Sequence, residues 1–347
     1  MRRQAEQLSV AAQGLKFTSF AVGGGTPLIL DEGQLEELFC LAELFGVHPS
    51  RVFTSVETSP EYTQKSVLRQ LRARGVERLS MGVQSFNETE LKKLKRRPGL
   101  GTVVGALENI VEAGFPQFNL DLIYGIEGQT VESFMRSLNT ALTYRPNELF
   151  IYPLYVRPGT RINVRSTDDI GYAIYKSARE LLVGQGFVQT SMRRFVRRET
   201  TETEFSCGDE VMLSCGAGGR SYLGNLHYAT PYAVRQQAIA DEIDHYIRTT
   251  DFMTAANGFL LSTEEMQIRF IIKNLMYHRG VDLAEYEKRF GEKPDRNLFR
   301  EFTDRGWIEE TGRIVRLTEE GMAYSDYIGQ AFISPVVRKL MSEYVYP

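Results

Sequence analysis

Three consecutive glycines, Gly23, Gly24 and Gly25, are followed by Thr26 and come directly after the apolar run Phe17–Val22. The run predicts a buried β-strand. Glycine allows backbone angles that are closed to other residues, and it lets a backbone approach a ligand closely. The sequence therefore predicts a backbone contact with a ligand at this strand end. A simple tight turn is the alternative interpretation.

Two acidic side chains lie at or near the ends of further predicted strands. Glu57 follows one strand, and Asp121 lies within an apolar run. A buried carboxylate without a partner is costly, so Asp121 should meet a hydroxyl or a cation. Glu57 could equally be a solvated carboxylate at the rim of the sheet, and Asp121 could cap a loop.

Gln84 and Arg96 complete the set of candidate binding residues. The amide of Gln84 has two donors and two acceptor sites, which suits ribose hydroxyls. The guanidinium of Arg96 is a permanent cation whose shape fits a carboxylate. Arg96 also lies in the charge run 92–97, and such runs usually form a solvated face.

Repeated β-α units are predicted from residue 17 to residue 152. Predicted strands cover Phe17–Val22, Val52–Val56, Arg78–Val83, Phe118–Ile123 and Leu149–Tyr152, and predicted helices cover Asp31–Phe45, Ser59–Ala73, Glu88–Leu94, Thr102–Ala113 and Val131–Leu142. This alternation predicts a parallel sheet, either a barrel or an open doubly wound sheet. In both, ligands bind at the carboxyl ends of the strands, where the candidate residues fall.

The remainder of the chain divides into a middle region and a helical region. The expected elements are a helix at Tyr172–Gly184, an extended segment at Phe187–Phe195, a glycine-rich turn at 214–222, helices at Thr263–Tyr277, Leu283–Phe290 and Asp295–Arg305, a hairpin at Ile308–Leu317 and a last helix from Glu319.

Three segments join the glycine run in a recognisable order and spacing. They are Ser80–Phe86, Asn119–Gly125 and Leu154–Thr160. Together they resemble the radical S-adenosylmethionine enzymes of the oxygen-independent coproporphyrinogen III oxidase type. The resemblance implies an α/β fold, a partial (β/α)6 barrel that lacks its first strand, with a small C-terminal helical domain of winged-helix outline. The domains expected are 1–165 for the barrel, 166–258 for an extension of it and 259–347 for the C-terminal domain.

The resemblance also implies S-adenosylmethionine as a cofactor. The segment Gly23, Gly24, Gly25 and Thr26 matches the part that contacts the methionyl ammonium, and Glu57 matches a glutamate that touches the same group. Gln84 and Asp121 would then bind the ribose, and Arg96 the carboxylate. No catalytic residue and no metal ligand is assigned.

Members of this family hold a [4Fe-4S] cluster with three cysteines spaced Cys-x3-Cys-x2-Cys before the glycine run. No cysteine precedes Gly23 here, and Cys207 and Cys215 are too few to hold a cluster alone. We therefore expect that the printed chain, expressed alone, binds no cluster and behaves poorly in solution. Because residues 1–13 read as the second half of a helix, we also expect an upstream extension that carries the missing strand and cysteines.

The family suggests two functions. The first is an oxidoreductase that acts on a tetrapyrrole or related substrate with an electron donor such as flavodoxin or ferredoxin. The second is a non-catalytic carrier of haem or a tetrapyrrole. A haem-trafficking branch carries a His-Asn-x-x-Tyr-Trp motif, which is absent from the corresponding stretch 204–209, and His227–Tyr228 is a weak substitute.

A basic cluster in the middle region has two interpretations. Arg193, Arg194, Arg197 and Arg198, with Arg220, could bind substrate carboxylates, or they could form a solvent-exposed hairpin.

The charge balance disfavours nucleic-acid binding. The net charge is −3 for the whole chain, and residues 259–347 hold 15 acidic and 13 basic residues, whereas a DNA-binding module should show a basic face. Three cysteines in total fit a reducing cytoplasm. No apolar run reaches the roughly 18 residues that a membrane span needs.

Overall fold

A seven-stranded sheet organises the first two hundred residues of the computed structural model, which describes residues 1–96, 99–156, 168–198, 211–231, 233 and 235–344. The strand order is β1-β2-β3-β4-β5-β7-β6. The strands are β1 (Ser19–Val22), β2 (Phe53–Thr58), β3 (Arg78–Gln84), β4 (Gln117–Tyr124), β5 (Glu148–Pro153), β6 (Phe187–Gln189) and β7 (Arg194–Arg197). The first five pair in parallel with their neighbours, as the β-α alternation predicts.

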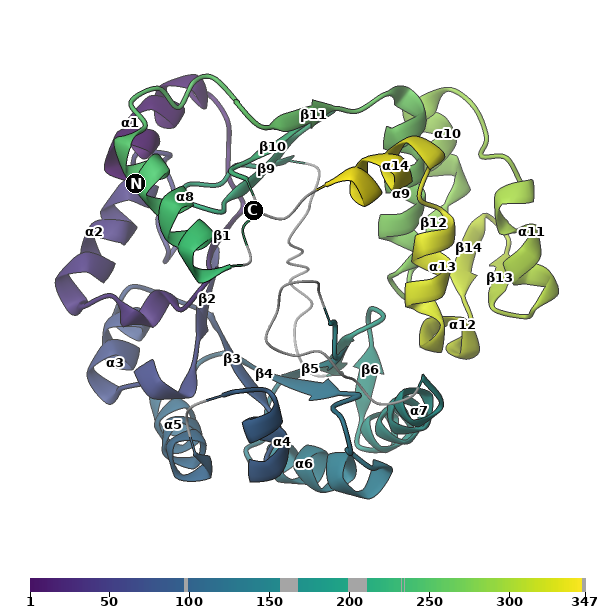
Figure 1. The fold of residues 1–347 in the computed structure, drawn as a ribbon, viewed down its shortest axis with the longest axis horizontal. Coiled ribbons are helices and arrows are strands. Elements are labelled where there is room, and N and C mark those ends of the chain that lie inside the picture. Colours follow the sequence, from purple (N-terminus) through teal and green to yellow (C-terminus); the bar gives the residue numbers. More distant parts are fainter. Residues whose placement is uncertain (97–98, 157–167, 199–210, 232, 234, 345–347) are drawn as a thin grey trace.

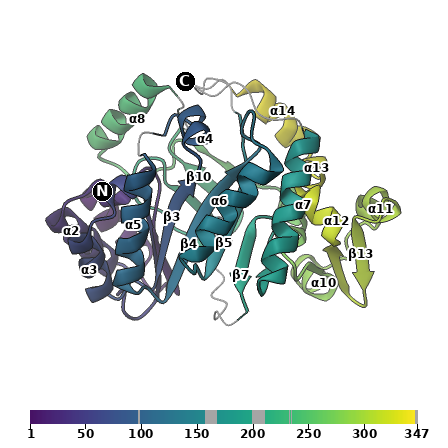
Figure 2. The same cartoon turned by 90° about the horizontal axis from the view of Figure 1, so that it is seen from below.

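Helices cover the outer face of this sheet (Figures 1 and 2). The helical elements are α1 (Arg2–Ala11), η1 (Pro27–Ile29), α2 (Glu32–Glu43), η2 (Pro60–Tyr62), α3 (Lys65–Ala73), α4 (Glu88–Lys93), α5 (Leu100–Ala113), α6 (Val131–Thr143) and α7 (Asp168–Gly184). Local signals fix several boundaries. Asp31 and Gln34 form a capping box at the start of α2, and Gly114 ends α5 in the left-handed conformation at φ 62°.

The two faces of the sheet differ in chemistry because successive strand residues point to opposite sides. Outward residues such as Leu79, Leu120 and Leu149 are fully buried under the helices. Residues that point to the inner face are largely polar. The hydrophobic core therefore lies between sheet and helices, and the inner face is left for polar contacts.

The segment Phe187–Phe195, expected as one extended piece, is instead a hairpin. β6 and β7 pair antiparallel, and β7 adds antiparallel to β5. The prediction was wrong because Met192 and Arg193 form a bend between the strands, and the Ser191 side chain accepts from the backbone N–H of Arg194 at 3.2 Å.

A second sheet follows the hairpin in the chain. Its order is β11-β10-β9-β8, from β8 (Val211–Met212), β9 (Arg220–Leu223), β10 (Leu226–Ala229) and β11 (Gly258–Leu260), with α8 (Gln236–Arg248) between the last two. Helix α1 contacts this region: Gln4 accepts hydrogen bonds from the Gly216 N–H at 2.8 Å and from the Tyr246 hydroxyl at 2.7 Å. The expectation of a helix at the N-terminus is confirmed, with Leu8 and Ala12 buried.

The C-terminal region has its own core and a three-stranded sheet. It comprises α9 (Thr263–Leu275), β12 (Val281–Asp282), α10 (Leu283–Phe290), α11 (Asn297–Asp304), β13 (Ile308–Thr311), β14 (Ile314–Leu317), α12 (Glu319–Ala323), α13 (Ser325–Ala331) and α14 (Pro335–Glu343). The expected hairpin is confirmed. The last helix is divided into three, and the helix expected from Ser59 begins only at Lys65, after the short turn η2.

Buried and half-buried ionic contacts join the C-terminal region to the main sheet. Arg193, beside β7, is 5% exposed and contacts Asp326 of α13 at 2.5 Å and the Tyr155 hydroxyl at 2.6 Å. Nearby, Tyr172 of α7 donates to Glu320 of α12. In the described ranges no helix has the length and apolarity needed to cross a bilayer.

Candidate functional site

The glycine turn after β1 contacts Glu57 near the end of β2. The Gly24 N–H donates to the Glu57 carboxylate at 3.3 Å, and Gly24 and Gly25 have φ of 79° and 68°. At Gly23 a Cβ would lie 2.9 Å from the carboxyl carbon of Glu57. A side chain at position 23 would push this carboxylate away, so the turn and the carboxylate form one unit. Thr26 then precedes the short helix η1.

Gln84 ends β3 in an unusual backbone conformation. Its φ is 72°, its side chain is buried, and the pairing with β4 is shifted between Gly82 and Gln84. A Cβ on Gly82 would lie only 2.5 Å from the amide nitrogen of Gln84. The bulge therefore re-aims the Gln84 side chain over Gly82, as bulges beside functional sites do.

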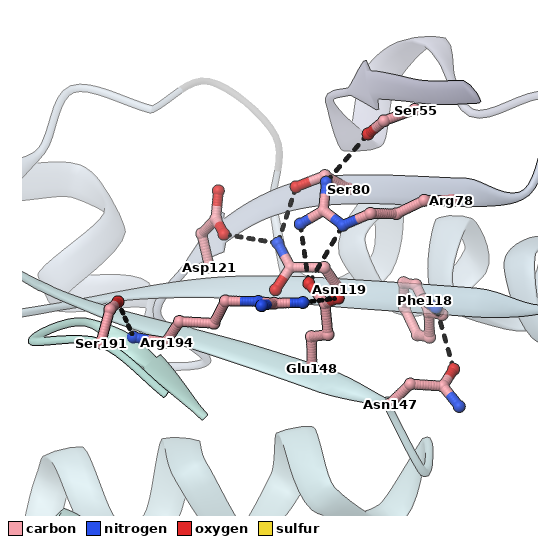
Figure 3. Close-up of polar contacts among 10 residues, drawn as sticks. All are labelled: Ser55, Arg78, Ser80, Phe118, Asn119, Asp121, Asn147, Glu148, Ser191 and Arg194. Atoms are coloured by element: carbon pink, nitrogen blue, oxygen red, sulfur yellow. Dashed lines mark hydrogen bonds and ion pairs between the residues drawn. The ribbon is translucent and has the colours of Figure 1, made fainter. Parts of the chain in front are cut away.

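Asp121 lies on the inner face of β4, next to Gly82 of β3 in the strand register. One of its carboxylate oxygens accepts from the amide of Asn119 at 2.7 Å (Figure 3). Burial raises the pKa of Asp121 from 3.8 to about 6, although Asn119 and Arg78 act in the opposite direction. The Asp121 carboxyl is therefore mostly ionised at pH 7 and takes up a proton when the pH falls slightly below neutral.

A buried ionic cluster lies beneath Asp121 on the same inner face (Figure 3). Glu148 is fully buried and accepts from Arg78 at 3.0 Å and from Arg194 at 2.7 Å. Arg78 also donates to Ser55 at 3.0 Å. Burial alone would raise the pKa of Glu148, but the two arginines outweigh it and the pKa is lowered. The cluster ties β2, β3, β5 and β7 together.

Arg96 lies apart from these residues, on a pocket at the end of β3. The pocket has a volume of about 250 Å³ and is also lined by Gly82, Val83 and Ser59. Among the described residues the Arg96 side chain is exposed and makes no hydrogen bond or ion pair. Its guanidinium is thus available to an anion that enters the pocket. Arg97 lies outside the described residues.

The structure thus brings together most of the candidates. Glu57 contacts the glycine turn, Asp121 lies beside Gly82, and Gly82 separates Gln84 from the Arg96 pocket. All lie towards the carboxyl ends of parallel strands, where such folds bind ligands.

Sequence reasoning missed the residues that support the candidates. Four of them are Arg78, Ser80, Asn119 and Glu148. Arg78 and Ser80, and then Asn119 and Asp121, alternate with apolar residues along β3 and β4. That period of two was the available signal, because it places the polar residues on one face of a strand.

Glu90 is a further residue that the sequence did not single out. Its carboxylate is buried and accepts from Ser85 at 2.6 Å, Gln129 at 2.9 Å and Ser133 at 2.6 Å. Gln129 also accepts from the Gly125 N–H at 2.8 Å. Glu90 therefore fixes the two loops that follow β3 and β4.

The arginines of the basic cluster have different surroundings, so neither interpretation, a site for substrate carboxylates or a solvent-exposed hairpin, holds for all of them. Arg193 and Arg194 are buried and paired with Asp326 and Glu148, which corrects the exposed interpretation for these two. Arg197 lies over the Phe187 ring at 4.6 Å, and only Arg198 of the four is exposed. Arg220 is exposed at the start of β9.

The two cysteines that the structure describes lie in different parts of the fold. Among the described residues no group of three or more His, Cys, Asp or Glu side chains could hold a metal ion. Cys40 is exposed on α2, Cys215 is half-buried beside the second sheet, and Cys207 lies outside the described residues. The described residues therefore offer no set of ligands for a [4Fe-4S] cluster.

The stretch 204–209 and residues 157–160 of the fourth motif also lie outside the described residues. His227 is described: burial lowers its pKa, its Nε2 is buried, and its ring lies 4.6 Å from that of Tyr222.

Two family patterns match this chain. The Radical SAM superfamily matches residues 1–141, and the HemN C-terminal domain matches residues 261–324. The chain belongs to the radical S-adenosylmethionine superfamily. Its relatives within this superfamily include oxygen-independent coproporphyrinogen III oxidases and haem chaperones.

Curated relatives carry both activities in their names. The heme chaperone HemW of Bacillus subtilis is 27% identical over 90% of this chain and 84% of its own length. The oxygen-independent coproporphyrinogen III oxidase of Salmonella typhimurium is 35% identical over 78% of this chain and 62% of its own length.

The solved coproporphyrinogen III oxidase (HemN) from Escherichia coli superposes with a TM-score of 0.80 at 22% identity. The match covers 95% of this chain and 81% of that chain. At this level of identity the likeness shows the fold alone. It supports an α/β fold with a largely parallel sheet and outer helices.

Proposed function

We propose that this chain is a coproporphyrinogen-oxidase-type protein that binds S-adenosylmethionine at the carboxyl ends of β1 to β4. The observation that carries the proposal is the unit formed by the glycine turn and Glu57, with Asp121 two strands away and within electrostatic reach of Glu57. A carboxylate next to close-packed backbone suits an ammonium group. The Asp121 carboxylate suits a ribose hydroxyl, because a charged acceptor makes a strong hydrogen bond.

The remaining assignments follow from position. Gln84 would share the ribose, since its amide is held above Gly82. Arg96 would pair with the methionyl carboxylate in its pocket, and Gly23, Gly24, Gly25 and Thr26 would contact the ammonium. Bound to a reduced cluster, this cofactor supplies a 5′-deoxyadenosyl radical. Because the described residues offer no cluster ligands, we expect no cofactor cleavage by the printed chain.

The fold assignment that accompanies this function is a partial barrel without its first strand. Its domains would be 1–165, 166–258 and 259–347, the last a winged-helix-like cover over the barrel mouth. The one-sided helices, the separate C-terminal core and the contact between Arg193 and Asp326 support it.

The substrate we propose is a tetrapyrrole or a related multi-carboxylate molecule. Relatives of this chain are named as coproporphyrinogen III oxidases and as heme chaperones, so a tetrapyrrole is common to both. The second candidate function, a non-catalytic haem or tetrapyrrole carrier, is favoured by the relatives named as heme chaperones and by the lack of cluster ligands among the described residues. An electron donor such as flavodoxin or ferredoxin belongs to the first function only.

Equilibrium binding of radiolabelled S-adenosylmethionine tests the site. We expect Arg96→Ala and Asp121→Ala each to weaken binding by at least tenfold, because a lost hydrogen bond to a charged group costs roughly 1.5–3 kcal/mol. Lys92→Ala is the matched control for Arg96, since it removes the same charge from the same run but does not line the pocket. Equal affinity in all the variants would reject the assignment.

A haem titration separates the two functions. A carrier should take up one haem with a defined absorbance band and no need for S-adenosylmethionine. Absence of haem binding, with cofactor binding intact, would favour the oxidase-type function.

A further inference from the structure

Four polar side chains form a row across the inner face of the sheet, one from each of four adjacent strands. The strand register places Glu57 beside Ser80, Ser80 beside Asn119, and Asn119 beside Glu148. The next row toward the carboxyl ends holds Asp121. Asn119 is therefore the residue through which the supporting row can reach the proposed binding residue.

Asn119 uses both of its amide hydrogens. The amide nitrogen donates to the Ser80 hydroxyl at 2.6 Å and to one oxygen of Asp121 at 2.7 Å. Asn119 is fully buried, and its carbonyl oxygen has no partner among the described residues. A flipped amide would point that oxygen at the carboxylate, so the orientation is fixed by repulsion as well as by attraction.

The second oxygen of Asp121 is left open by this arrangement. Among the described residues it accepts no hydrogen bond, and Figure 3 shows it directed away from the cluster. Beside Asp121 in the register is Gly82, which presents no side chain. Asn119 thus occupies one oxygen and leaves the other for a ligand hydroxyl.

We propose that Asn119 is a positioning residue that orients the Asp121 carboxylate, keeps it ionised near neutral pH and thereby makes ligand binding at this site pH-dependent. The identity of the ligand, S-adenosylmethionine, rests on the proposed function, whereas the positioning does not.

Charges from every neighbouring strand act on Asp121. Burial raises its pKa to about 6, the Asn119 hydrogen bond and Arg78 of β3 lower it, and Glu57 of β2 and Glu148 of β5 raise it. Arg194 of β7 is paired with Glu148. Among the groups that act on Asp121, Asn119 is the uncharged one, and it contacts the carboxylate directly. Replacing Asn119 should therefore change the pKa of Asp121.

The test replaces Asn119 by aspartate in the full chain. Asn119→Asp keeps the shape but places a second carboxyl within about 3 Å of Asp121, so the two should share a proton and one titration should rise strongly. Asn147→Asp is the matched control. Asn147 accepts from the Phe118 N–H at 2.9 Å, which a carboxylate can also do, and it lies away from Asp121 in Figure 3.

Two readouts are needed. Carbon-13 NMR of carboxyl-labelled aspartate, with Asp121→Asn to identify the resonance, should give a midpoint near 6 in the parent chain and in Asn147→Asp. In Asn119→Asp it should rise by at least two pH units, which is the rise that a tenfold loss of the ionised form at pH 7 requires. Binding of S-adenosylmethionine at pH 7 should fall at least tenfold in Asn119→Asp and recover no more than partly at pH 8.

The outcomes separate the two proposals. An unchanged Asp121 midpoint in Asn119→Asp overturns the positioning role, whatever binds at the site. A midpoint that rises in Asn119→Asp, together with a parent chain that binds no S-adenosylmethionine, supports the positioning role and rejects the ligand. Because Asn119→Asp could fail to fold, Asn119→Ser provides a second variant. It should raise the midpoint by a smaller amount, since a hydroxyl cannot donate to both partners.

Discussion

Arg78 and Glu148 form a two-point contact inside the sheet, with Nε at 3.0 Å and Nη2 at 2.9 Å from the same carboxylate oxygen. The two residues lie seventy positions apart in the chain and two strands apart in the sheet. Arg194 contacts the other oxygen, so one carboxylate holds two buried cations. This arrangement makes Glu148 a residue whose loss is costly.

We expect Glu148→Gln to lower the free energy of unfolding by about 3–5 kcal/mol, because it leaves two buried arginines without their anion. Urea denaturation followed by far-UV circular dichroism measures this change. Glu108→Gln on the exposed side of α5 is the control, and it should stay within about 0.5 kcal/mol of the parent. A Glu148→Gln chain as stable as the control would show that the cluster adds nothing to stability.

Glu148 should also make the protein sensitive to acid. Its pKa in the folded state is lowered from 4.5, so the stability that it contributes is present above pH 4.5 and is lost as the pH falls through the folded-state pKa. Denaturation midpoints measured between pH 3 and pH 6 should therefore fall more steeply for the parent than for Glu148→Gln. Parallel curves would contradict this assignment.

Asp121 should have the opposite effect on stability. Its folded-state pKa of about 6 lies above the ordinary 3.8, so the folded state binds the extra proton and stability declines as the pH rises from 3.8 to 6. The increase in the pKa of Asp121 corresponds to a loss of about 3 kcal/mol in the free energy of unfolding. Because solvent reaches part of the side chain, we expect a loss of about 2 kcal/mol.

The variant Asp121→Asn tests this sign. It should be more stable than the parent by about 2 kcal/mol at pH 7, and the difference should disappear near pH 4. Thermal unfolding at both pH values is sufficient. Greater stability of the parent at pH 7 would mean that Asp121 has a stabilising partner in the folded chain.

Gly23→Ala should disturb the binding site more than the fold. The new methyl group would lie 2.9 Å from the Glu57 carboxyl carbon, so that flexible side chain must move away from the turn. We expect binding of S-adenosylmethionine to weaken at least tenfold while the unfolding midpoint changes little. Gly105→Ala in α5 is the control, because nothing lies within 4 Å of its added carbon, and it should stabilise the helix by about 0.5–1 kcal/mol. Unchanged binding of S-adenosylmethionine in Gly23→Ala would mean that Glu57 does not contact the ligand.

Asp326→Ala should loosen the contact between the C-terminal region and the sheet. The variant removes the carboxylate partner of the buried Arg193 and the acceptor of the Tyr155 hydroxyl, at a cost of about 1–3 kcal/mol. Among the described residues Arg193 then keeps its contact with the Tyr155 hydroxyl. Limited trypsin digestion should then release the C-terminal region sooner than in the exposed control Asp304→Ala. Equal digestion rates in the two variants would mean that contacts other than Arg193–Asp326 hold the C-terminal region against the sheet.

The sequence by itself determined the elements and the family. Repeats of apolar strands and amphipathic helices predicted the five parallel strands, and the helix start predicted at Asp31 and the helix end predicted at Ala113 agree with the structure. Such signals are local, since a cap or a glycine acts within one turn of its own position. The glycine run, Glu57 and Asp121 were singled out by their places at or near predicted strand ends, whereas the ammonium contact of the glycine run and Glu57 was inferred from the family resemblance.

Only the tertiary structure decided which of these residues meet and what supports them. Ser80, Asn119 and Glu148 form one row because three strand pairs fix a common register. Arg193 and Arg194 look alike in sequence, but strand alternation sends Arg194 to Glu148, whereas Arg193, at the bend before β7, meets Asp326. Their partners lie 46 and more than 100 residues away along the chain. Pairing over such separations depends on how strands and domains pack together, and no local pattern encodes that packing.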